Sequence, residues 1–568
     1  MNLRLFFQRF LRNDFFAALV ILGIFLLTNR YIYGWDDQHL EIPLLKHLID
    51  PALYAGDYYV ESLSRNFSSY LYPILARLIT VDMIPVVYLV LFCVVRYIFF
   101  YWVYRLWKWI SGDQLTALCA TLTLFLLGRS EEFIFRTFSH EEFALAIIFA
   151  GFYFFYRDRF LLASILLGIA ANFHAIYALF PMVYLSVYVL LCVKDRGWTF
   201  LKTGLAFVGF ASPFIIWHFS HALKANGGTV PVEEWVRLYL LACPQCFPLG
   251  TANPNEMITN FGVLFSRWYG YLFLIVLYGA HCLWNQDFRR DKKAHTIMGV
   301  SAFFVVVCFF CAYVKPVRFI LDLNLTRFMS FAHFLLIGYT AVFLMKLAQK
   351  KELWWALMAG VLFLLIGWAD TPMILSKILR YWWILAALGG FFAVAYQFRS
   401  SPFLPTMKKM FLVIPLAGMF VGYCQLHYNY VQMTQRGGGF WQLQRNWEDM
   451  QRYAKAHTPK DALFLTPYDM EMGGFRIHSD RRVIVCYRDC GIIGFDYQAV
   501  KEWQERIQEI EAFKVFTKQD IRPALMNAIG KYGATHIVFM RYYEPQGEVG
   551  FLKKMYANEV FSLYQVIR

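Results

Sequence analysis

Two neighbouring aspartates, Asp36 and Asp37, stand in the stretch YIYGWDDQHLEIP, which directly follows the first apolar run of the chain. A carboxylate that the fold holds in place can act as a general base or bind a cation. Loop acids that only face solvent would give the same local pattern. The functional interpretation is favoured here because other connections bring further polar groups to the same ends of the apolar runs.

A second polar stretch, GRSEEFIFRTFSHEEFA, and a third, AANFHAIYAL, supply these groups. Their candidate site residues are Glu131, Glu132, His140, Glu141, Glu142 and His174. Carboxylates with a histidine can bind magnesium, manganese or calcium, so Asp37 and Glu141 are candidate metal ligands. The alternative is structural. SHEE before FALAIIFA is typical of a serine N-cap with acids in the first helical turn, and His174 alone fits a hydrogen-bonded interior histidine.

Basic residues in KPVRFILDLNLTRFMSF form another set, with Lys315, Arg318 and Arg327. By the orientation argued below they lie on the outer side, where basic residues are uncommon in short loops. A planar guanidinium matches phosphate oxygens, so we expect these residues, and Arg327 above all, to bind an anionic lipid phosphate. The alternative is that they only extend toward lipid headgroups.

The elements that must position these residues are expected to be membrane-spanning helices. The 568 residues are 59% hydrophobic and 16% charged, with a mean hydropathy of +0.44, whereas an ordinary soluble domain carries about 25% charged residues. The aromatic content of 19% suits two interfacial belts. The net charge of +15 is interpreted first as a topology signal, and nucleic-acid binding is not expected.

Apolar runs that can cross roughly 30 Å of hydrocarbon number about thirteen. They lie near 14–32, 84–105, 115–129, 140–157, 160–173, 176–194, 199–218, 266–284, 297–314, 328–348, 352–369, 379–397 and 409–425. No small-residue cleavage site follows the first run, which is expected to remain as an anchor. Lysines and arginines cluster in alternate connections, which predicts a cytoplasmic N terminus. An odd number of spans then places the tail outside, with outer loops at 33–83 and 219–265.

The expected fold is a polytopic α-helical membrane domain over 1–425, with about 11–13 spans, followed by an extracytoplasmic α/β domain over 426–568. The tail alternates helical and strand patterns from FWQLQRNWEDMQRYAKA to FSLYQVI. The glycines of TQRGGGF mark the boundary. For Cys243 with Cys246 in CPQC the sequence favours a structural disulfide over a redox motif, and Cys486 with Cys490 in VCYRDCG is a second candidate pair; the sequence leaves open whether either disulfide forms.

Together these features resemble the GT-C superfamily of integral membrane glycosyltransferases. The run YGWDDQHLEIPLLKHLIDPALYAGDYYVES looks closest to uncharacterised bacterial members. The tail stretches TPKDALFLTPYDMEMGGFRIHSDRRVIV and YGATHIVF with FSLYQVIR are similar to the end domain of oligosaccharyltransferase catalytic subunits. The tryptophan-rich acceptor motif of those enzymes is absent, because Tyr468, Asp469 and Met470 stand at that place, so peptide glycosylation is not implied.

The resemblance implies a polyprenyl-phosphate-linked sugar donor, an inverting transfer to an extracytoplasmic glycan, lipid or protein, and a place in the bacterial inner membrane. It implies that Asp37, or its neighbour Asp36, is the base or a metal ligand, and the only cofactor it suggests is a divalent cation. In the tail, Asp469 and Arg476 are expected to contact the acceptor. Two other functions remain open: a transporter or flippase of lipid-linked sugars, and a non-catalytic assembly subunit with the same fold.

Overall fold

The computed structural model describes residues 13–29, 31–126, 133, 135–224, 231–242, 247, 274–349, 440–470, 474–494, 496–514, 520–545 and 549–567. The spans expected near 352–369, 379–397 and 409–425 lie outside these residues, as do Glu131, Glu132, Cys243 and Cys246. The predictions made for them therefore stay predictions.

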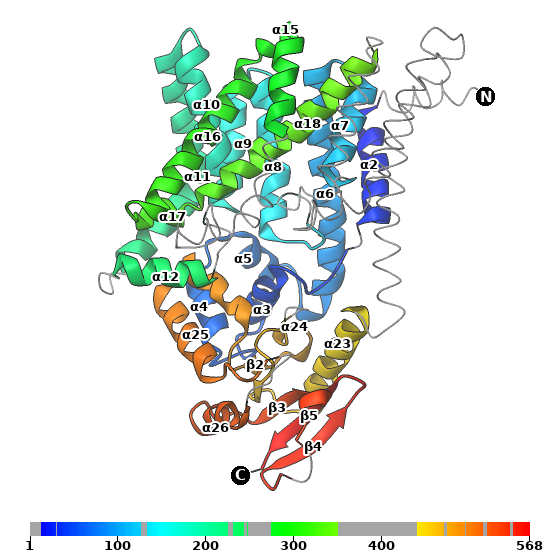
Figure 1. The fold of residues 1–568 in the computed structure, drawn as a ribbon, viewed down its shortest axis with the longest axis vertical. Helices are drawn as coiled ribbons and strands as arrows, with labels where there is room; N and C mark the ends of the chain where they lie inside the picture. Colours follow the sequence, from blue (N-terminus) through cyan, green and yellow to red (C-terminus); the bar gives the residue numbers. More distant parts are fainter. Residues whose placement is uncertain are drawn as a thin grey trace, which may run out of the picture.

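A bundle of helices forms one half of the molecule and is drawn at the top of Figure 1. Its described helices are α2 (Asp14–Thr28), α6 (Ile84–Ser111), α7 (Gln114–Leu126), α8 (His140–Tyr156), α9 (Phe160–Ala171), α10 (Ala175–Cys192), α11 (Arg196–Lys224), α16 (Lys292–Tyr313) and α18 (Phe328–Gln349). Among the described residues, five helical stretches are long and apolar enough to cross a membrane, and four apolar helices are shorter. The mainly helical architecture is confirmed, with fewer long spans in this part than the sequence predicts.

The rim of the bundle is apolar. Val86 on α6, Leu205 on α11 and Val306 on α16 each expose more than 60% of their surface. In contrast, α18 lies almost wholly inside the bundle, where Gly338 leaves room for the Trp107 indole of α6. Extended apolar surfaces mark contacts with a membrane or with another protein. The rim is therefore a contact surface suited to lipid or to another protein.

Short helices form a layer beneath the bundle (Figure 1). They are α3 (Gln38–Ile49), α4 (Tyr58–Asn66), α5 (Leu71–Ala76), η1 (Val81–Met83), α12 (Val232–Ala242), α17 (Arg318–Asp322) and η3 (Leu325–Arg327). The small helix α15 (Gln286–Arg289) lies at the opposite end of the bundle. The predicted outer loop at 33–83 is thus largely helical, and α4 begins where the Asp57 carboxylate accepts the backbone N–H groups of Tyr59 and Val60.

The tail is an α/β unit, as predicted. Its elements are α23 (Phe440–His457), β1 (Leu463–Leu465), α24 (Arg476–Ser479), β2 (Arg482–Val483), η4 (Tyr487–Gly494), α25 (Tyr497–Glu509), α26 (Arg522–Gly530), β3 (His536–Met540), η5 (Arg541–Tyr543), β4 (Leu552–Ala557) and β5 (Phe561–Val566). The sheet has the order β2-β1-β3-β5-β4. Strand β1 pairs in parallel with β2 and β3, whereas β5 is antiparallel to β3 and β4.

The tail docks on the short-helix layer through buried ion pairs. Lys46 of α3 lies 2.5 Å from Asp480, and Arg476 bonds to Asp57 at 2.7 Å and to Asp489 at 2.8 Å. One apolar core continues from the bundle into the tail. The short layer is therefore held from both sides, which fixes the segment that carries the two aspartates.

The candidate disulfide between Cys486 and Cys490 does not form, because both cysteines are free. Cys490 is buried and Cys486 is half-buried, and free cysteine packs as a small apolar residue. The Cys490 Sγ atom lies 3.5 Å from the Ala242 carbonyl oxygen of α12, so this cysteine helps to join the tail to the outer layer.

Candidate functional site

The segment that precedes α3 is fixed by its own turn and by the second polar stretch. Gly34 has a φ of +82°, and its N–H donates to the Gln38 Oε1 atom at 2.6 Å. The other end of the Gln38 amide donates to the Phe138 carbonyl at 2.8 Å, and the Ile32 N–H donates to the Arg136 carbonyl at 2.8 Å. The two polar stretches, about a hundred residues apart in sequence, are therefore bound side by side.

Asp37 occupies the N-cap position of α3, yet its side chain makes no capping hydrogen bond. The helix start is satisfied instead by backbone bonds, in which the Asp37 carbonyl accepts from Leu40 and Glu41. Burial, together with the negative charges of Glu141 and Glu41, raises the pKa of the Asp37 carboxyl to about 7. The structure thus gives Asp37 a proton affinity suited to exchange near neutral pH.

Glu141, in the first turn of α8, joins two other predicted residues. Its Oε1 atom lies 3.0 Å from an Arg327 Nη1 atom and 3.1 Å from the His174 Nε2 atom. The His174 Nδ1 atom accepts the Tyr177 N–H at 3.1 Å, so its proton sits on Nε2 and points at Glu141. Burial lowers the pKa of His174 to about 4, which keeps the ring neutral.

Glu41 is a site residue that the sequence did not single out. It lies on α3, and its Oε1 atom is 2.5 Å from the His140 Nδ1 atom. The His140 and His174 rings stack with their centroids 5.1 Å apart. Burial raises the pKa of Glu41 well above its usual range, with Glu141 adding to the effect. The spacing of four residues from Asp37 on a helix was the available signal, because such residues share one face.

These contacts define the site cluster, whose members come from the three polar stretches and from η3. They are Asp36, Asp37, Glu41, His140, Glu141, His174 and Arg327. The Arg327 guanidinium also lies over the Tyr177 ring, 4.9 Å from its centroid. Its side chain keeps 33% of its surface exposed, whereas the Glu141 side chain keeps 7%.

Glu142, predicted together with Glu141, faces another way. Its carboxylate pairs with Arg96 of α6, and both side chains are almost fully buried. Arg96 also donates to the carbonyls of Phe133 at 2.7 Å and Phe135 at 3.0 Å. Adjacent residues on a helix point to different faces, so Glu142 serves to hold the second polar stretch while Glu141 faces the cluster.

The tail brings a charge to the cluster that was not predicted. Burial raises the pKa of Asp36, and the nearby Arg488 of η4 and Arg136 oppose that rise.

The expectation for Arg476 is replaced by a structural role, because its guanidinium is buried and donates to Asp57, Asp489 and the Val483 carbonyl. Asp469 is half-buried in the turn after β1.

The remaining predicted phosphate-binding residues lie beside the cluster without joining its contacts. Arg318 pairs with Asp322 at 3.4 Å, and its guanidinium carbon lies 5.6 Å from the centre of the Trp235 ring. Lys315 is exposed at the end of α16. Of the three basic residues, Arg327 is therefore the one that the structure brings to the acids.

The described side chains do not fit the expected divalent cation. No group of three or more His, Cys, Asp or Glu side chains in the described ranges is arranged to hold a metal ion. The Glu141 Oε1 atom already accepts hydrogen bonds from Arg327 and His174. These residues therefore give no support for a chemical step through a metal.

Comparison with known proteins finds a match to a family profile in the tail. Residues 445–510 match the profile described as "Domain of unknown function (DUF6798)". This stretch contains most of α23, the strands β1 and β2, and the docking residues Arg476, Asp480 and Asp489. No curated protein matches the chain.

Proposed function

We propose that this chain is a membrane glycosyltransferase that moves a sugar from a polyprenyl-phosphate-linked donor to an acceptor outside the cytoplasm. The observation that carries the proposal is the site cluster, in which a half-buried Asp37 with a pKa of about 7 lies near Glu141, Glu41 and His140, while Glu141 itself contacts His174 and Arg327. Titratable groups with such perturbed pKa values gather at catalytic sites more often than elsewhere. The resemblance to the GT-C superfamily supports the same assignment.

Asp37 is the proposed general base. An acceptor hydroxyl loses its proton as its oxygen forms the new bond to the anomeric carbon of the donor sugar. A base is most effective when its pKa lies near the working pH, and one positioned carboxylate contributes about 10²–10⁴-fold. Asp37 meets this condition and has no capping duty in α3 that would compete for the proton.

Arg327 is the proposed partner of the leaving group. As the bond from the anomeric carbon to the phosphate oxygen breaks, that oxygen takes the electron pair, and a guanidinium can stabilise the charge through two parallel hydrogen bonds. Glu141 and Tyr177 hold Arg327 in place from the protein side. One displacement without a covalent intermediate inverts the anomeric carbon.

The apolar rim and the five long helices support a place in a membrane. The proposal that this is the bacterial cytoplasmic membrane, with the tail on the outer side, rests on the resemblance and on the placement of lysines and arginines in the sequence. The proposed partners are the lipid-linked donor, the surrounding lipids and an acceptor glycan, lipid or protein. The cluster lies at the border between bundle and short-helix layer, which is where a donor with an apolar chain and a polar head would place its phosphate.

The test is transfer of labelled sugar by the purified full chain in nanodiscs, with polyprenyl-phosphate-linked hexoses as donors and envelope glycans as acceptors. Asp37→Asn should lower transfer by about 10²–10⁴-fold, because the base is lost. Asp461→Asn, at an exposed position of the tail, is the matched control and should leave transfer unchanged.

Full transfer by the double variant D36N/D37N would refute the proposal. Movement of labelled lipid-linked sugar across proteoliposomes without a new glycosidic bond would identify a transporter instead. Absence of transfer with every donor, together with a stable co-purifying enzyme, would identify an assembly subunit.

A further inference from the structure

His140 is bound by Glu41 in a way that leaves one ring nitrogen without a partner at the site cluster. Its Nδ1 atom lies 2.5 Å from Glu41 Oε1, while its Nε2 atom makes no hydrogen bond with any described residue. We infer that the His140 Nε2 atom donates a hydrogen bond to a phosphate oxygen of the lipid-linked donor, and that Glu41 is the positioning residue that orients the ring. The inference rests on the proposed function and gives Arg327 a second group at the phosphate.

The His140 ring is fixed by its neighbours. It lies nearly parallel to the His174 ring, with 5.1 Å between the two centroids, and the Phe67 ring stands nearly perpendicular to it at 5.0 Å. The His140 backbone N–H donates to the Tyr72 hydroxyl at 3.3 Å, and the same hydroxyl lies 3.5 Å from Nδ1. Rotation of the ring would break the bond to Glu41, so these contacts hold Nε2 on the side away from that carboxyl group.

The Nε2 atom is accessible to a ligand. It does not belong to the enclosed polar atoms that lack a partner in the described part of the chain, whereas the Glu41 Oε2 atom does. The His140 side chain keeps 14% of its surface exposed, and the Glu41 side chain keeps 1%. A carboxyl group on one ring nitrogen of a histidine sets the orientation and the proton of the other nitrogen. Glu41 therefore prepares Nε2 for a contact outside the protein core.

The proton between Glu41 and His140 belongs to the carboxyl group. Glu41 is enclosed and one of its oxygens has no partner among the described residues, which makes the ionised form costly. Burial raises the pKa of Glu41 well above its usual range, and the charge of Glu141 adds to the effect. A neutral Glu41 donates to Nδ1, so the neutral His140 ring carries its own proton on Nε2. The accessible nitrogen is then a donor, which matches a phosphate oxygen.

His174 connects this donor to the guanidinium proposed for the leaving group. The His174 Nε2 atom lies 3.2 Å from Arg327 Nη1, and Glu141 Oε1 contacts both side chains. His140 stacks on the face of the same His174 ring. Arg327 and His140 are thus separated by one ring, a gap that the oxygens of a phosphate or diphosphate can bridge. Hydrogen bonds to a charged oxygen are stronger than those to a neutral one, so each contact contributes to donor binding.

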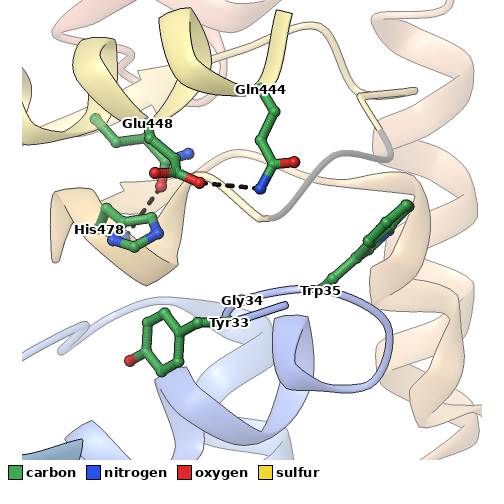
Figure 2. Close-up of a pocket in the computed structure, with 7 residues that line it drawn as sticks. Tyr33, Gly34, Trp35, Gln444, Glu448 and His478 are labelled. Carbon is green, nitrogen blue, oxygen red and sulfur yellow. Dashed lines mark hydrogen bonds between the residues drawn. The ribbon is translucent and has the colours of Figure 1, made fainter. Parts of the chain in front are cut away.

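The small pocket beside the two aspartates does not compete for this ligand. Figure 2 shows its labelled lining residues, which come from α23, α24 and the segment before Asp36: Tyr33, Gly34, Trp35, Gln444, Glu448 and His478. The pocket has room for about one water molecule. A phosphate does not fit there, so the contacts of the donor phosphate are assigned to Arg327 and His140.

The experiment measures phosphate binding separately from transfer. The full chain in nanodiscs is titrated with tritiated farnesyl phosphate, and with farnesol as the ligand without a phosphate. His140→Gln should bind farnesyl phosphate like the unchanged protein, because its amide nitrogen reaches the place of Nε2. His140→Asn should bind it about tenfold or more weakly, because the shorter side chain loses a hydrogen bond to a charged oxygen. Farnesol should bind equally to both variants. His457→Asn, at the exposed end of α23, is the control and should change neither ligand.

A measurement on the unchanged protein decides the case in which neither variant folds. Diethyl pyrocarbonate modifies accessible histidine rings, and mass spectrometry gives the extent at each position. Farnesyl phosphate should lower the modification of His140 severalfold and leave that of the exposed His457 unchanged. Farnesol should protect neither ring.

The role of Glu41 is tested through its coupling to His140. Glu41→Gln keeps an amide donor for Nδ1 and should bind farnesyl phosphate like the unchanged protein, whereas Glu41→Leu should bind it as weakly as H140N. The double variant E41L/H140N should be no weaker than H140N alone, because Glu41 acts through the ring. Losses that add in the double variant would show that Glu41 does not position His140.

Equal binding of farnesyl phosphate by H140N and H140Q, or no protection of His140, would overturn the inference, and transfer that depends on Asp37 would then leave the proposed function intact. Loss of methyl glycoside binding in H140N, with phosphate binding kept, would show that Nε2 accepts from a sugar hydroxyl and would overturn it as well. If His140 is protected and H140N binds weakly, but D36N/D37N transfers sugar normally, the proposed function fails and the phosphate contact stands.

Discussion

Asp37 sets a pH dependence that can be measured at the scale of one residue. A base must be deprotonated to act, so transfer should be low below the Asp37 pKa of about 7 and should rise as the pH passes through it. Because the Glu141 charge raises this pKa, Glu141→Gln should shift the rise to lower pH. The measurement is kcat/KM against pH for both proteins.

Glu505→Gln, at an exposed position of α25, provides the control for this profile and should leave it unchanged. An E141Q profile that rises at higher pH than the unchanged protein would contradict the assignment of Glu141 as the charge that raises the Asp37 pKa. The test compares the pH at which kcat/KM rises and not its height, because E141Q is also expected to lower the rate by removing the partner that holds Arg327.

Asp36 carries backbone strain beside the base. Its φ of +49° lies in the left-handed region, which aspartate and asparagine tolerate better than residues without a short polar side chain. Asp36→Ala should therefore lower stability by about 1 kcal/mol relative to Asp36→Asn. Thermal unfolding of the two variants tests this, with Asp36→Gly as the unstrained control, and equal midpoints for all three would contradict it.

Several site residues were predictable from the sequence by type and position. Asp37, Glu141, His174 and Arg327 were named from polar stretches at the ends of apolar runs, and the structure brings them together. The separate roles of Glu141 and Glu142 were not predictable, because they depend on the rotation of α8 against α6. Arg488 was not predictable either, since its contact with the cluster exists only after the tail docks.

At the scale of elements, Arg96 clamps the start of α8 to α6. It pairs with Glu142 and holds the Phe133 and Phe135 carbonyls, so removing it leaves a buried carboxylate and two carbonyls without their donor. Breaking one side of a buried pair costs about 3–5 kcal/mol. Arg96→Met should therefore cause a large loss of thermal stability and, through the displaced Glu141, a loss of transfer.

The double variant R96M/E142L separates charge from shape in this clamp. Because replacing both partners by apolar residues is often neutral, it should recover much of the stability lost by R96M alone. A double variant as unstable as R96M would show that the carbonyl contacts of Phe133 and Phe135 dominate. Arg105→Met is the comparison on the same helix. Arg105 pairs with Asp14 at 3.4 Å and donates to the Tyr101 and Tyr153 hydroxyls at 3.0 Å, but both charges are partly exposed, so its loss leaves no fully buried carboxylate unpaired.

The elements themselves were predicted unevenly, for physical reasons. Long apolar runs such as α6 and α16 and the amphipathic helices α23 and α25 follow from periodicity. The helices α3 to α5 were expected as an outer loop, because Pro43 lies inside α3 and short mixed segments give little periodic signal. Strand β4 was missed since its LKKMYA pattern exposes two lysines at the sheet edge, where charges are common.

At the scale of the whole molecule, the tail is held by ion pairs that the sequence pattern could not reveal, because their partners lie more than four hundred residues apart. Arg476→Met should leave Asp57 and Asp489 buried without their cation, at a cost of about 3–5 kcal/mol. The tail should then loosen from α3 and α4. Hydrogen–deuterium exchange should rise in 57–66 and 476–490, while the helices of the bundle keep their protection.

Arg522→Met is the matched control, because Arg522 pairs with Asp520 where both side chains are at least half exposed, and such pairs contribute little. In R476M, transfer should fall with the cluster residues unaltered, since Arg488 leaves Asp36 and the pocket between α23 and Trp35 opens. Faster exchange in R476M with unchanged transfer would mean that the bundle and the short-helix layer suffice for the reaction. The tail would then be dispensable for catalysis, and the acceptor would have to be bound elsewhere.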